Sequence, residues 1–395
     1  MRNQLTSIRI KNFRSLADVT VRTDALNVIF GPNGAGKSTF LDTLWFIRDC
    51  ALRGIEPASA DRSHGIGLLW DGANQGSNLS IKLETSLAEY EILIGFTSGR
   101  IETFVGEILY SKNRKTNLID RRVGSEKADF YHTGMQQAAT FTLREPDKLA
   151  LAQYLVYDDE SRAASELERL LRFMNFYHTR EVDLYGLKKF GSEASFQTWL
   201  QGRAQNLWSV LRNLHDRRGR DERYDTIIGF MRESFPSFQD LLIEQTGPNA
   251  VYASFIEKGH VNPIQASGVS DGHLQMLVLL TSLFSVRPDH IALILLDEPE
   301  ISLHPFALSV FAKAVEVATE GWNKQVFIAT HSPVLISQFK PDDILAAEID
   351  ESGKTNLKRV SEMEGIKDLL QEYATGSLYM AEMIAAQSKP VFAGA

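Results

Sequence analysis

The 395-residue sequence predicts an α/β fold with a mainly parallel sheet, an antiparallel N-terminal lobe and a mostly helical insertion. In the last third, short apolar runs alternate with helical periodicity, as residues 291–296 and 306–318 show. Such alternation is typical of a parallel sheet that is covered on both faces. Near the start, residues 7–10 alternate polar and apolar side chains, which predicts a half-buried strand.

The remaining elements follow from the same patterns. The length favours two to three domains, at about 150 residues each. We assign residues 1–135 to an N-terminal lobe, 136–236 to a helical insertion and 237–395 to a C-terminal lobe. Further strands are expected at 25–30, 80–84, 90–96, 240–244, 251–257 and 325–329, and further helices at 37–49, across much of 146–229, and at 274–283.

Composition excludes several classes of protein. The formal net charge is −8, which excludes a wholly basic nucleic-acid-binding protein and leaves only local basic patches for such contacts. The single cysteine, Cys50, forms neither an internal disulfide nor a zinc cage, so we expect a reducing cytoplasm. No signal peptide opens the chain, and its apolar runs are shorter than the ~20 residues of a membrane span. We therefore predict a cytoplasmic protein with no membrane partner.

The strongest motif lies at residues 31–38, which read Gly-Pro-Asn-Gly-Ala-Gly-Lys-Ser and match the phosphate-loop pattern. Glycine lets the backbone turn tightly and approach phosphate oxygens. The N–H groups of the loop and of the helix that follows favour an anion. We expect Lys37 to reach the β and γ phosphates and Ser38 to bind Mg²⁺. The predicted nucleotide-binding residues are Gly31, Asn33, Gly34, Ala35, Gly36, Lys37, Ser38 and Thr39.

A second motif ends an apolar strand with Asp297, Glu298 and Pro299. The carboxyl ends of strands form the usual ligand edge of an open α/β sheet. Asp297 is therefore a candidate for holding Mg²⁺, and Glu298 is a candidate general base that polarises the attacking water. The alternative interpretation is a strand that ends in a solvated acidic turn.

Two weaker signals follow the same logic. Ser270 precedes an apolar helix and is placed to cap it, which also creates a site for an anion. His331 follows a buried strand, where its side chain could touch a γ-phosphate. By themselves, a simple capped helix and a hydrogen-bonded loop histidine are the better interpretations of these two signals.

The order of these motifs resembles that of the ABC-type ATPases and, within them, the SMC/RecF-like group. The gaps are 233 residues from Lys37 to Ser270, 27 from Ser270 to Asp297 and 34 from Asp297 to His331. The resemblance makes residues 31–38 the Walker A motif, 270–273 the signature motif, 293–298 the Walker B motif and His331 the switch histidine. The segment 12–15 resembles the end of the group's first strand, and 302–305 falls where the D-loop belongs. Departures are Asp271 and His273 in the signature and His304 in the D-loop, and Gln75 is only a weak candidate for the usual Q-loop glutamine.

The resemblance implies an ATPase that uses ATP and Mg²⁺ in a homodimer with two shared sites. Lys37, Glu298 and His331 would be catalytic, and Ser38 and Asp297 would hold the metal. Ser270 and Gly272 would contact the nucleotide of the partner copy. The group includes OLD-family heads, whose appended nuclease domain has no room in the 64 residues after His331.

Several functions remain open. The first is an ATP-gated switch that controls a separately encoded, nucleic-acid-directed or toxic effector in prokaryotic antiviral defence. The second is a DNA repair or recombination ATPase that acts directly on DNA. A transporter energy subunit is opposed by the 233-residue gap, and a binding-only scaffold is a fourth option. Two basic clusters are candidate nucleic-acid contacts, although a solvated charged surface is the favoured interpretation because acidic residues dilute their charge. Their members are Lys112, Arg114, Lys115, Arg121, Arg122, Arg212, Arg217, Arg218, Arg220 and Arg223.

Overall fold

The computed structural model describes residues 4–62, 66–73, 77–97, 100–287, 291–365, 369, 373–381 and 383–385. A six-stranded sheet lies at its centre, with the strand order β10-β15-β16-β3-β17-β18. All neighbouring pairs in this sheet are parallel except β17 and β18. The mainly parallel sheet that the sequence predicted is therefore confirmed. Its strands are β3 (Leu26–Phe30), β10 (Met174–His178), β15 (Ala292–Asp297), β16 (Lys324–Thr330), β17 (Ile344–Ile349) and β18 (Thr355–Arg359).

Each face of this sheet packs into a different hydrophobic core. On β15, Leu293 and Leu295 belong to the core that contains helix α1 (Lys37–Arg53), whereas Ile294 and Leu296 belong to the core that contains α8 (Asp271–Phe284) and α9 (Pro305–Gly321). Successive side chains of a strand point to opposite faces. The continuous apolar run in the sequence therefore reflects a strand that is buried on both sides.

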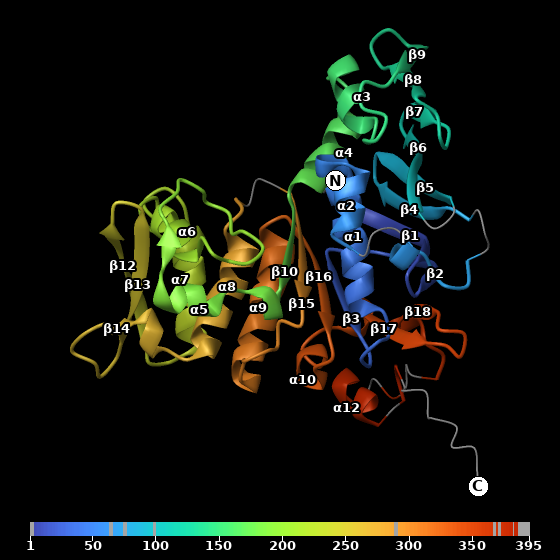
Figure 1. Ribbon diagram of the computed structural model, residues 1–395. Helices are drawn as coiled ribbons and strands as arrows, with labels where there is room; N and C mark the ends of the chain where they lie inside the picture. Colours follow the sequence, from blue (N-terminus) through green and yellow to red (C-terminus); the bar gives the residue numbers. More distant parts are fainter. Residues whose placement is uncertain are drawn as a thin grey trace.

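The N-terminal lobe is an antiparallel sheet with the order β2-β1-β4-β5-β6-β7-β8-β9, which extends beyond the parallel sheet in Figure 1. This antiparallel lobe is also as the sequence predicted. Helix α2 (Ile55–Ala60) packs beside α1, and α3 (Leu151–Tyr157) and α4 (Arg162–Arg172) return the chain toward the parallel sheet. The strands are β1 (Leu5–Phe13), β2 (Leu16–Arg22), β4 (Leu79–Thr85), β5 (Ala88–Thr97), β6 (Arg100–Ser111), β7 (Thr116–Arg121), β8 (Lys127–His132) and β9 (Gln137–Thr142).

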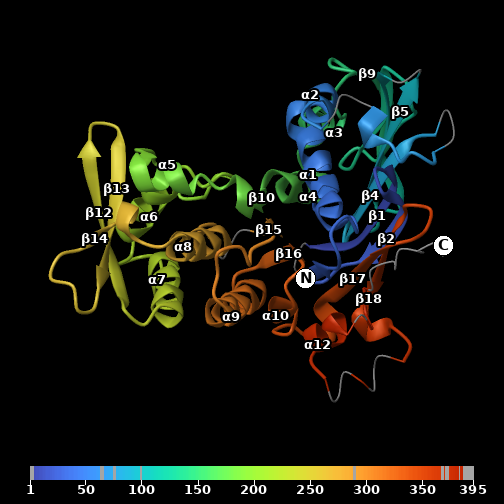
Figure 2. The ribbon, with the colours of Figure 1, turned by 60° about the horizontal axis from the view of Figure 1, so that its bottom comes forward.

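A third part of the molecule, which we call the arm, projects on the other side of the parallel sheet in Figures 1 and 2. It comprises residues 184–284. The predicted hairpin is present, because β12 (Phe238–Gly247) and β13 (Ala250–Glu257) pair antiparallel. The arm's other elements are α5 (Leu184–Lys189), β11 (Ser192–Glu193), α6 (Leu207–His215), α7 (Arg223–Ser234), β14 (Ile264–Gln265) and α8.

Residues 136–236 are less helical than the sequence suggested. The range contains β9, and it also contains β10, which joins the parallel sheet beside β15. The aromatic segment 173–177, which lies inside the range 146–229 where we expected mainly helices, is largely part of β10. Residues 174–178 form a strand because β10 pairs along its length with β15. This pairing depends on tertiary structure, and no local sequence pattern reveals it.

The C-terminal elements that the structure describes are short. They include α10 (Pro333–Ile336) and α12 (Thr375–Met380), which contact each other beneath the sheet. Across the described part of the chain, no helix is both long and apolar enough to cross a bilayer.

Candidate functional site

The phosphate loop runs from the end of β3 to the start of α1. Gly36 has a φ of 89° and caps α1, and a Cβ at this position would lie 2.3 Å from Oγ1 of Thr355. At Gly31, a Cβ would lie 2.2 Å from the carbonyl oxygen of Ala347. Strands β17 and β18 therefore pack against one side of the loop, so closely that only glycine fits at positions 31 and 36. The opposite side of the loop, with Asn33, Gly34 and Ser38, is exposed.

The Lys37 side chain folds back across this loop. Its ammonium group donates to the carbonyl oxygens of Gly31 and Pro32, each at 2.9 Å, and the residue is 7% exposed. Burial lowers the pKa of Lys37, whereas the acidic residues Asp297, Glu298 and Glu300 act in the opposite direction. The buried cation is held by backbone oxygens, which leaves it able to exchange these partners for phosphate oxygens.

Ser38 and Asp297 meet as the sequence suggested. The Ser38 hydroxyl donates to Oδ1 of Asp297 at 3.1 Å. Asp297 is 1% exposed, and its other oxygen, Oδ2, accepts no hydrogen bond and lies 3.4 Å from Nε2 of His178. Burial raises the pKa of Asp297, while the Ser38 hydrogen bond and His178 oppose that shift.

These residues fit a magnesium ion. A buried carboxylate oxygen without a hydrogen-bond partner is costly, and a divalent cation satisfies it. Within the described ranges, no group of three or more His, Cys, Asp or Glu side chains forms a metal cage. Mg²⁺ usually needs only one or two protein oxygens when phosphates and waters complete its shell. Ser38 and Asp297 supply that kind of partial site beside the phosphate loop.

Glu298 lies immediately after β15 in a strained conformation. Its φ is 52°, an unusual value for a residue other than glycine, and its N–H donates to the Ala329 carbonyl oxygen at 2.8 Å. Its Oε1 lies 3.6 Å from Nδ1 of His331. Glu300 fixes the histidine backbone, because its Oε1 accepts from the N–H of His331 at 3.1 Å. The ends of β15 and β16 thus bring together the candidate base and the candidate switch histidine.

The Ser270 region is built separately, at the start of α8. Ser270 caps this helix, since its Oγ accepts from the N–H of His273 at 3.4 Å, and the same oxygen lies 2.7 Å from Nδ1 of that histidine. A Cβ on Gly272 would lie 2.7 Å from the carbonyl oxygen of Ser302. His304 caps α9 through Nδ1, so it has a structural partner in this chain. Figure 2 shows α8 in the arm, separated from α1 by β10 and β15.

The structure thus brings five predicted residues together at the phosphate loop and places two other predicted residues away from it. Lys37, Ser38, Asp297, Glu298 and His331 gather around the phosphate loop. Ser270 and Gly272 lie on the helix of the other core. Their assigned roles stay predictions. Gln75 lies outside the described residues.

Sequence reasoning missed two residues, His178 and Arg180. His178 ends β10 opposite Asp297, and Nε of Arg180 donates to Oε2 of Glu298 at 2.5 Å. A signal was available, because a short aromatic strand followed by His-Thr-Arg-Glu has the same apolar-then-polar form as the ends of β15 and β16.

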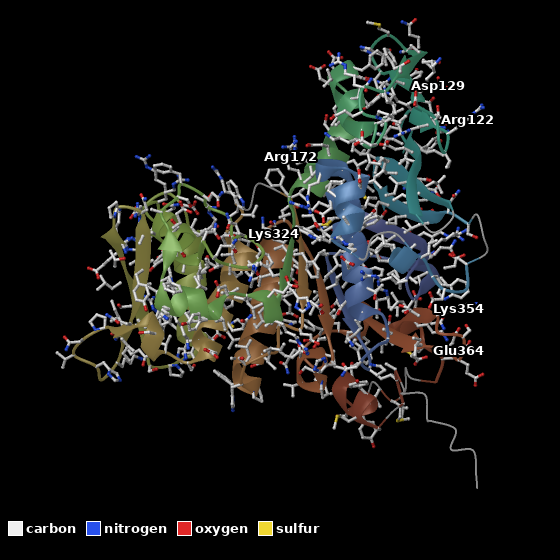
Figure 3. The ribbon with its side chains drawn as sticks, in the orientation of Figure 1. Arg122, Asp129, Arg172, Lys324, Lys354 and Glu364 are labelled. Carbon is white, nitrogen blue, oxygen red and sulfur yellow. The ribbon has the colours of Figure 1, made fainter. Side chains whose placement is uncertain are left out.

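Two of the predicted nucleic-acid contacts are wrong. Arg121 is 3% exposed and donates to the carbonyl oxygens of Ser125 and Lys148. Arg223 is 2% exposed and pairs with Asp221 at 2.5 Å. Both guanidinium groups are used inside the fold. Six of the other candidate contacts are exposed, namely Arg114, Lys115, Arg122, Arg217, Arg218 and Arg220. Figure 3 shows Arg122 toward the outer end of the antiparallel sheet.

The fold and site together define a P-loop ATPase head of the ABC and SMC type. The sequence pattern of the family described as "AAA domain, putative AbiEii toxin, Type IV TA system" matches residues 26–337, and the chain belongs to this family. Two solved SMC heads are similar in fold. One, bound to the C-winged helix domain of ScpA, has a TM-score of 0.52 and 14% identity and covers 90% of this chain and 97% of its own. The other, bound to the C-terminal domain of ScpA from Pyrococcus furiosus, has a TM-score of 0.52 and 12% identity. The match covers 94% of this chain and 99% of that structure's chain.

Two named proteins are similar in sequence. Endonuclease GajA of Bacillus cereus (strain VD045) is 24% identical over 419 residues, which cover 96% of this chain and 65% of that protein. The chain therefore spans slightly less than two thirds of the length of this relative. Protein ea59 of Escherichia phage lambda is 39% identical over 70 residues, which cover 18% of this chain and 13% of that protein.

Proposed function

We propose that the protein binds and hydrolyses ATP with Mg²⁺ and acts as a dimeric switch. The observation that carries this proposal is the contact of Ser38 with Asp297 beside the buried Lys37. It joins the two parts of the proposed phosphate and metal site, which lie 259 residues apart in the sequence. The SMC-type fold and the family membership support the same function.

Each residue has a chemical task in this proposal. Lys37 exchanges the loop carbonyls for the β and γ phosphates, and Ser38 and Asp297 hold the metal. When bound, Mg²⁺ neutralises charge that develops on the phosphate oxygens. Glu298 accepts a proton from the attacking water, and His331 lies beside it to contact the γ-phosphate.

The proposed homodimer explains why Ser270 lies away from the phosphate loop. Its helix start presents N–H groups and a hydroxyl that favour an anion. In a two-fold dimer, the γ-phosphate held by one copy faces this helix start of the other. ATP then joins the copies, whereas ADP lacks the phosphate that the contact needs.

The test is the variant Glu298→Gln, which removes the proton acceptor and leaves the phosphate contacts intact. We expect it to bind ATP, to dimerise with ATP and not with ADP, and to hydrolyse at least ~100-fold more slowly than the wild type. Size-exclusion chromatography with light scattering and a phosphate-release assay provide the readouts. Lys37→Ala is the control that should neither bind nor dimerise. A Glu298→Gln protein that stays monomeric in ATP would contradict the dimeric switch.

We further propose that the switch controls a nucleic-acid-directed or toxic effector in prokaryotic antiviral defence. The likeness to a protein named an endonuclease and the family's description support this direction. Direct action on DNA is the second candidate, and the exposed arginines Arg217, Arg218 and Arg220 favour it. Purifying the ATP-bound Glu298→Gln form separates the two, since a copurifying effector supports the first and bare DNA the second.

A further inference from the structure

Residues 178–188, which we call the strap, connect the parallel sheet to the arm. The strap begins at the end of β10, passes through a short turn at Thr179–Glu181 and ends in α5. At its first end, His178 lies 3.4 Å from Asp297, and Arg180 donates to Glu298 at 2.5 Å. The strap therefore contacts both acidic residues that follow the apolar run of β15.

The other end of the strap contacts the start of α8. The Lys188 ammonium donates to the carbonyl oxygen of Val269 at 2.8 Å and pairs with Asp271 at 2.6 Å. These two residues flank Ser270. The backbone of Lys188 is also held, because the Tyr252 hydroxyl donates to its carbonyl oxygen at 2.6 Å. The cap of α8 and the end of the strap are thus one hydrogen-bonded unit.

The middle of the strap is held by hydrogen bonds, such as that from the N–H of Asp183 to the carbonyl oxygen of Arg203 at 3.1 Å, although Arg180, Glu181 and Tyr185 are exposed. Asp183 caps α5, since its Oδ1 accepts from the N–H of Gly186 at 2.8 Å. Leu187 is 1% exposed, and its carbonyl oxygen accepts from the indole N–H of Trp208 at 3.1 Å. A short segment that is anchored at both ends and at points between them transmits a displacement of one end to the other.

We propose that the strap couples engagement of Ser270 to the orientation of Glu298, with Arg180 as the positioning residue. The proposal rests on the dimeric ATPase proposed above. When the partner's nucleotide engages the start of α8, Lys188 moves with that helix and shifts Arg180. Arg180 holds one oxygen of Glu298 and so sets where the other points. Engagement of one nucleotide thereby prepares hydrolysis of the second, which links the two sites of the dimer.

The test is a double-mutant cycle on kcat and KM for ATP. We expect Arg180→Ala and Lys188→Ala each to lower kcat roughly tenfold or more, with KM changed less than about twofold, because both act on orientation rather than on binding. The double variant should be no slower than the slower single variant, because both break one path. Arg180→Lys should recover part of kcat. Lys189→Ala is the matched control, since the interactions of this neighbour within the described part of the chain are with the rings of Tyr185 and Phe190 and with the Tyr185 hydroxyl.

The outcomes separate the strap from the proposed function. If the wild type hydrolyses ATP and Lys37→Ala does not, but the two single variants keep wild-type kcat or their losses multiply in the double variant, the strap proposal is wrong and the ATPase stands. If the wild type is no faster than Lys37→Ala, the proposed function itself fails. Asp271→Asn breaks the ion pair with Lys188 from the α8 side. It takes the place of Lys188→Ala in the double-mutant cycle if that variant does not fold.

Discussion

Gly272 shows how one residue limits the geometry of the α8 start. A Cβ there would lie 2.7 Å from the Ser302 carbonyl oxygen, which is backbone and moves only with the loop before α9. Glycine therefore permits the close approach of the Ser270 and Ser302 segments. Gly229, inside α7, has no atom within 4 Å of its ideal Cβ apart from its chain neighbours and the nearby backbone of its own helix, so it meets no such limit.

We expect Gly272→Ala and Gly229→Ala to have opposite effects on stability. The first should lower the free energy of unfolding by about 1–3 kcal/mol because a methyl group is forced against backbone. The second should raise it by about 0.5–1 kcal/mol because alanine favours a helix interior. Urea unfolding followed by circular dichroism measures both, and a stabilised Gly272→Ala protein would refute the close contact.

His273 adds a pH dependence at the same place. Its ring stacks on Phe235 with the centroids 3.8 Å apart, and burial lowers its pKa below the ordinary value of 6.5, an effect that Glu257 partly offsets. The folded protein then binds fewer protons than the unfolded chain, so the stability from this group is present above pH ~6.5 and is lost as the pH falls below it. We expect the melting temperature of the wild type to drop more than that of His273→Gln between pH ~7.5 and ~5.5. Equal drops would contradict the shift.

At the scale of elements, a charged network joins α1 to the chain after α2. Arg62 is 8% exposed and binds two carboxylates of α1, Asp42 at 2.6 Å and Asp49 at 2.9 Å. Arg14, in the turn after β1, pairs with the same Asp42 at 2.9 Å. The network holds the helix that starts at the phosphate loop against the N-terminal lobe.

Removing the buried guanidinium should be costly. We expect Arg62→Ala to lower the free energy of unfolding by about 1–3 kcal/mol because it removes a buried partner from Asp42 and Asp49, which keep only Arg14, Arg48 and the more distant Arg53. Arg162→Ala is the control, since its guanidinium is exposed, and its pair with Glu166 lies outside the network and should contribute about 0–1 kcal/mol. Chemical denaturation of the two variants provides the comparison, and losses of equal size would rule out a special role for the buried network.

At the scale of the whole molecule, the proposed sites are each divided between two copies. The two inactive variants Lys37→Ala and Ser270→Arg test this division. In a mixed dimer, one site combines an intact phosphate loop with an intact Ser270, while the other site has lost both. Ser270 is exposed, so the larger side chain is accommodated in the free protein.

We expect an equal mixture of the two variants to recover at most roughly a quarter of the wild-type ATPase rate, because half of the random dimers are mixed and each holds one intact site of two. Under the strap proposal, this recovery falls to roughly a tenth of that value, because the Lys37→Ala copy holds no nucleotide that could engage the α8 start of the copy that supplies Glu298. Each variant alone should remain inactive. Phosphate release after mixing measures the recovery. A mixture as inactive as its components would mean that each chain completes its own site.

Much of the fold could be predicted because local patterns decided it. Apolar runs such as 291–296 became strands buried on both faces, and the loop at Gly31 joined a strand to a helix as expected. The prediction failed at β10, whose five residues are stabilised by pairing with β15 rather than by any pattern of their own. It also misjudged Arg121 and Arg223, because a sequence does not show which guanidinium groups are buried.

The sequence alone determined the chemistry of the phosphate loop and the acidic strand end, since their residue types and order carry it. Only the tertiary structure decided that His178 and Arg180 reach Asp297 and Glu298, and that Lys188 reaches the Ser270 cap. The reason is physical. A motif consists of residues that are close in the sequence. These contacts instead join positions that are 81 to 119 residues apart. Such positions become neighbours only when β10 pairs with β15 and α5 packs beside the start of α8.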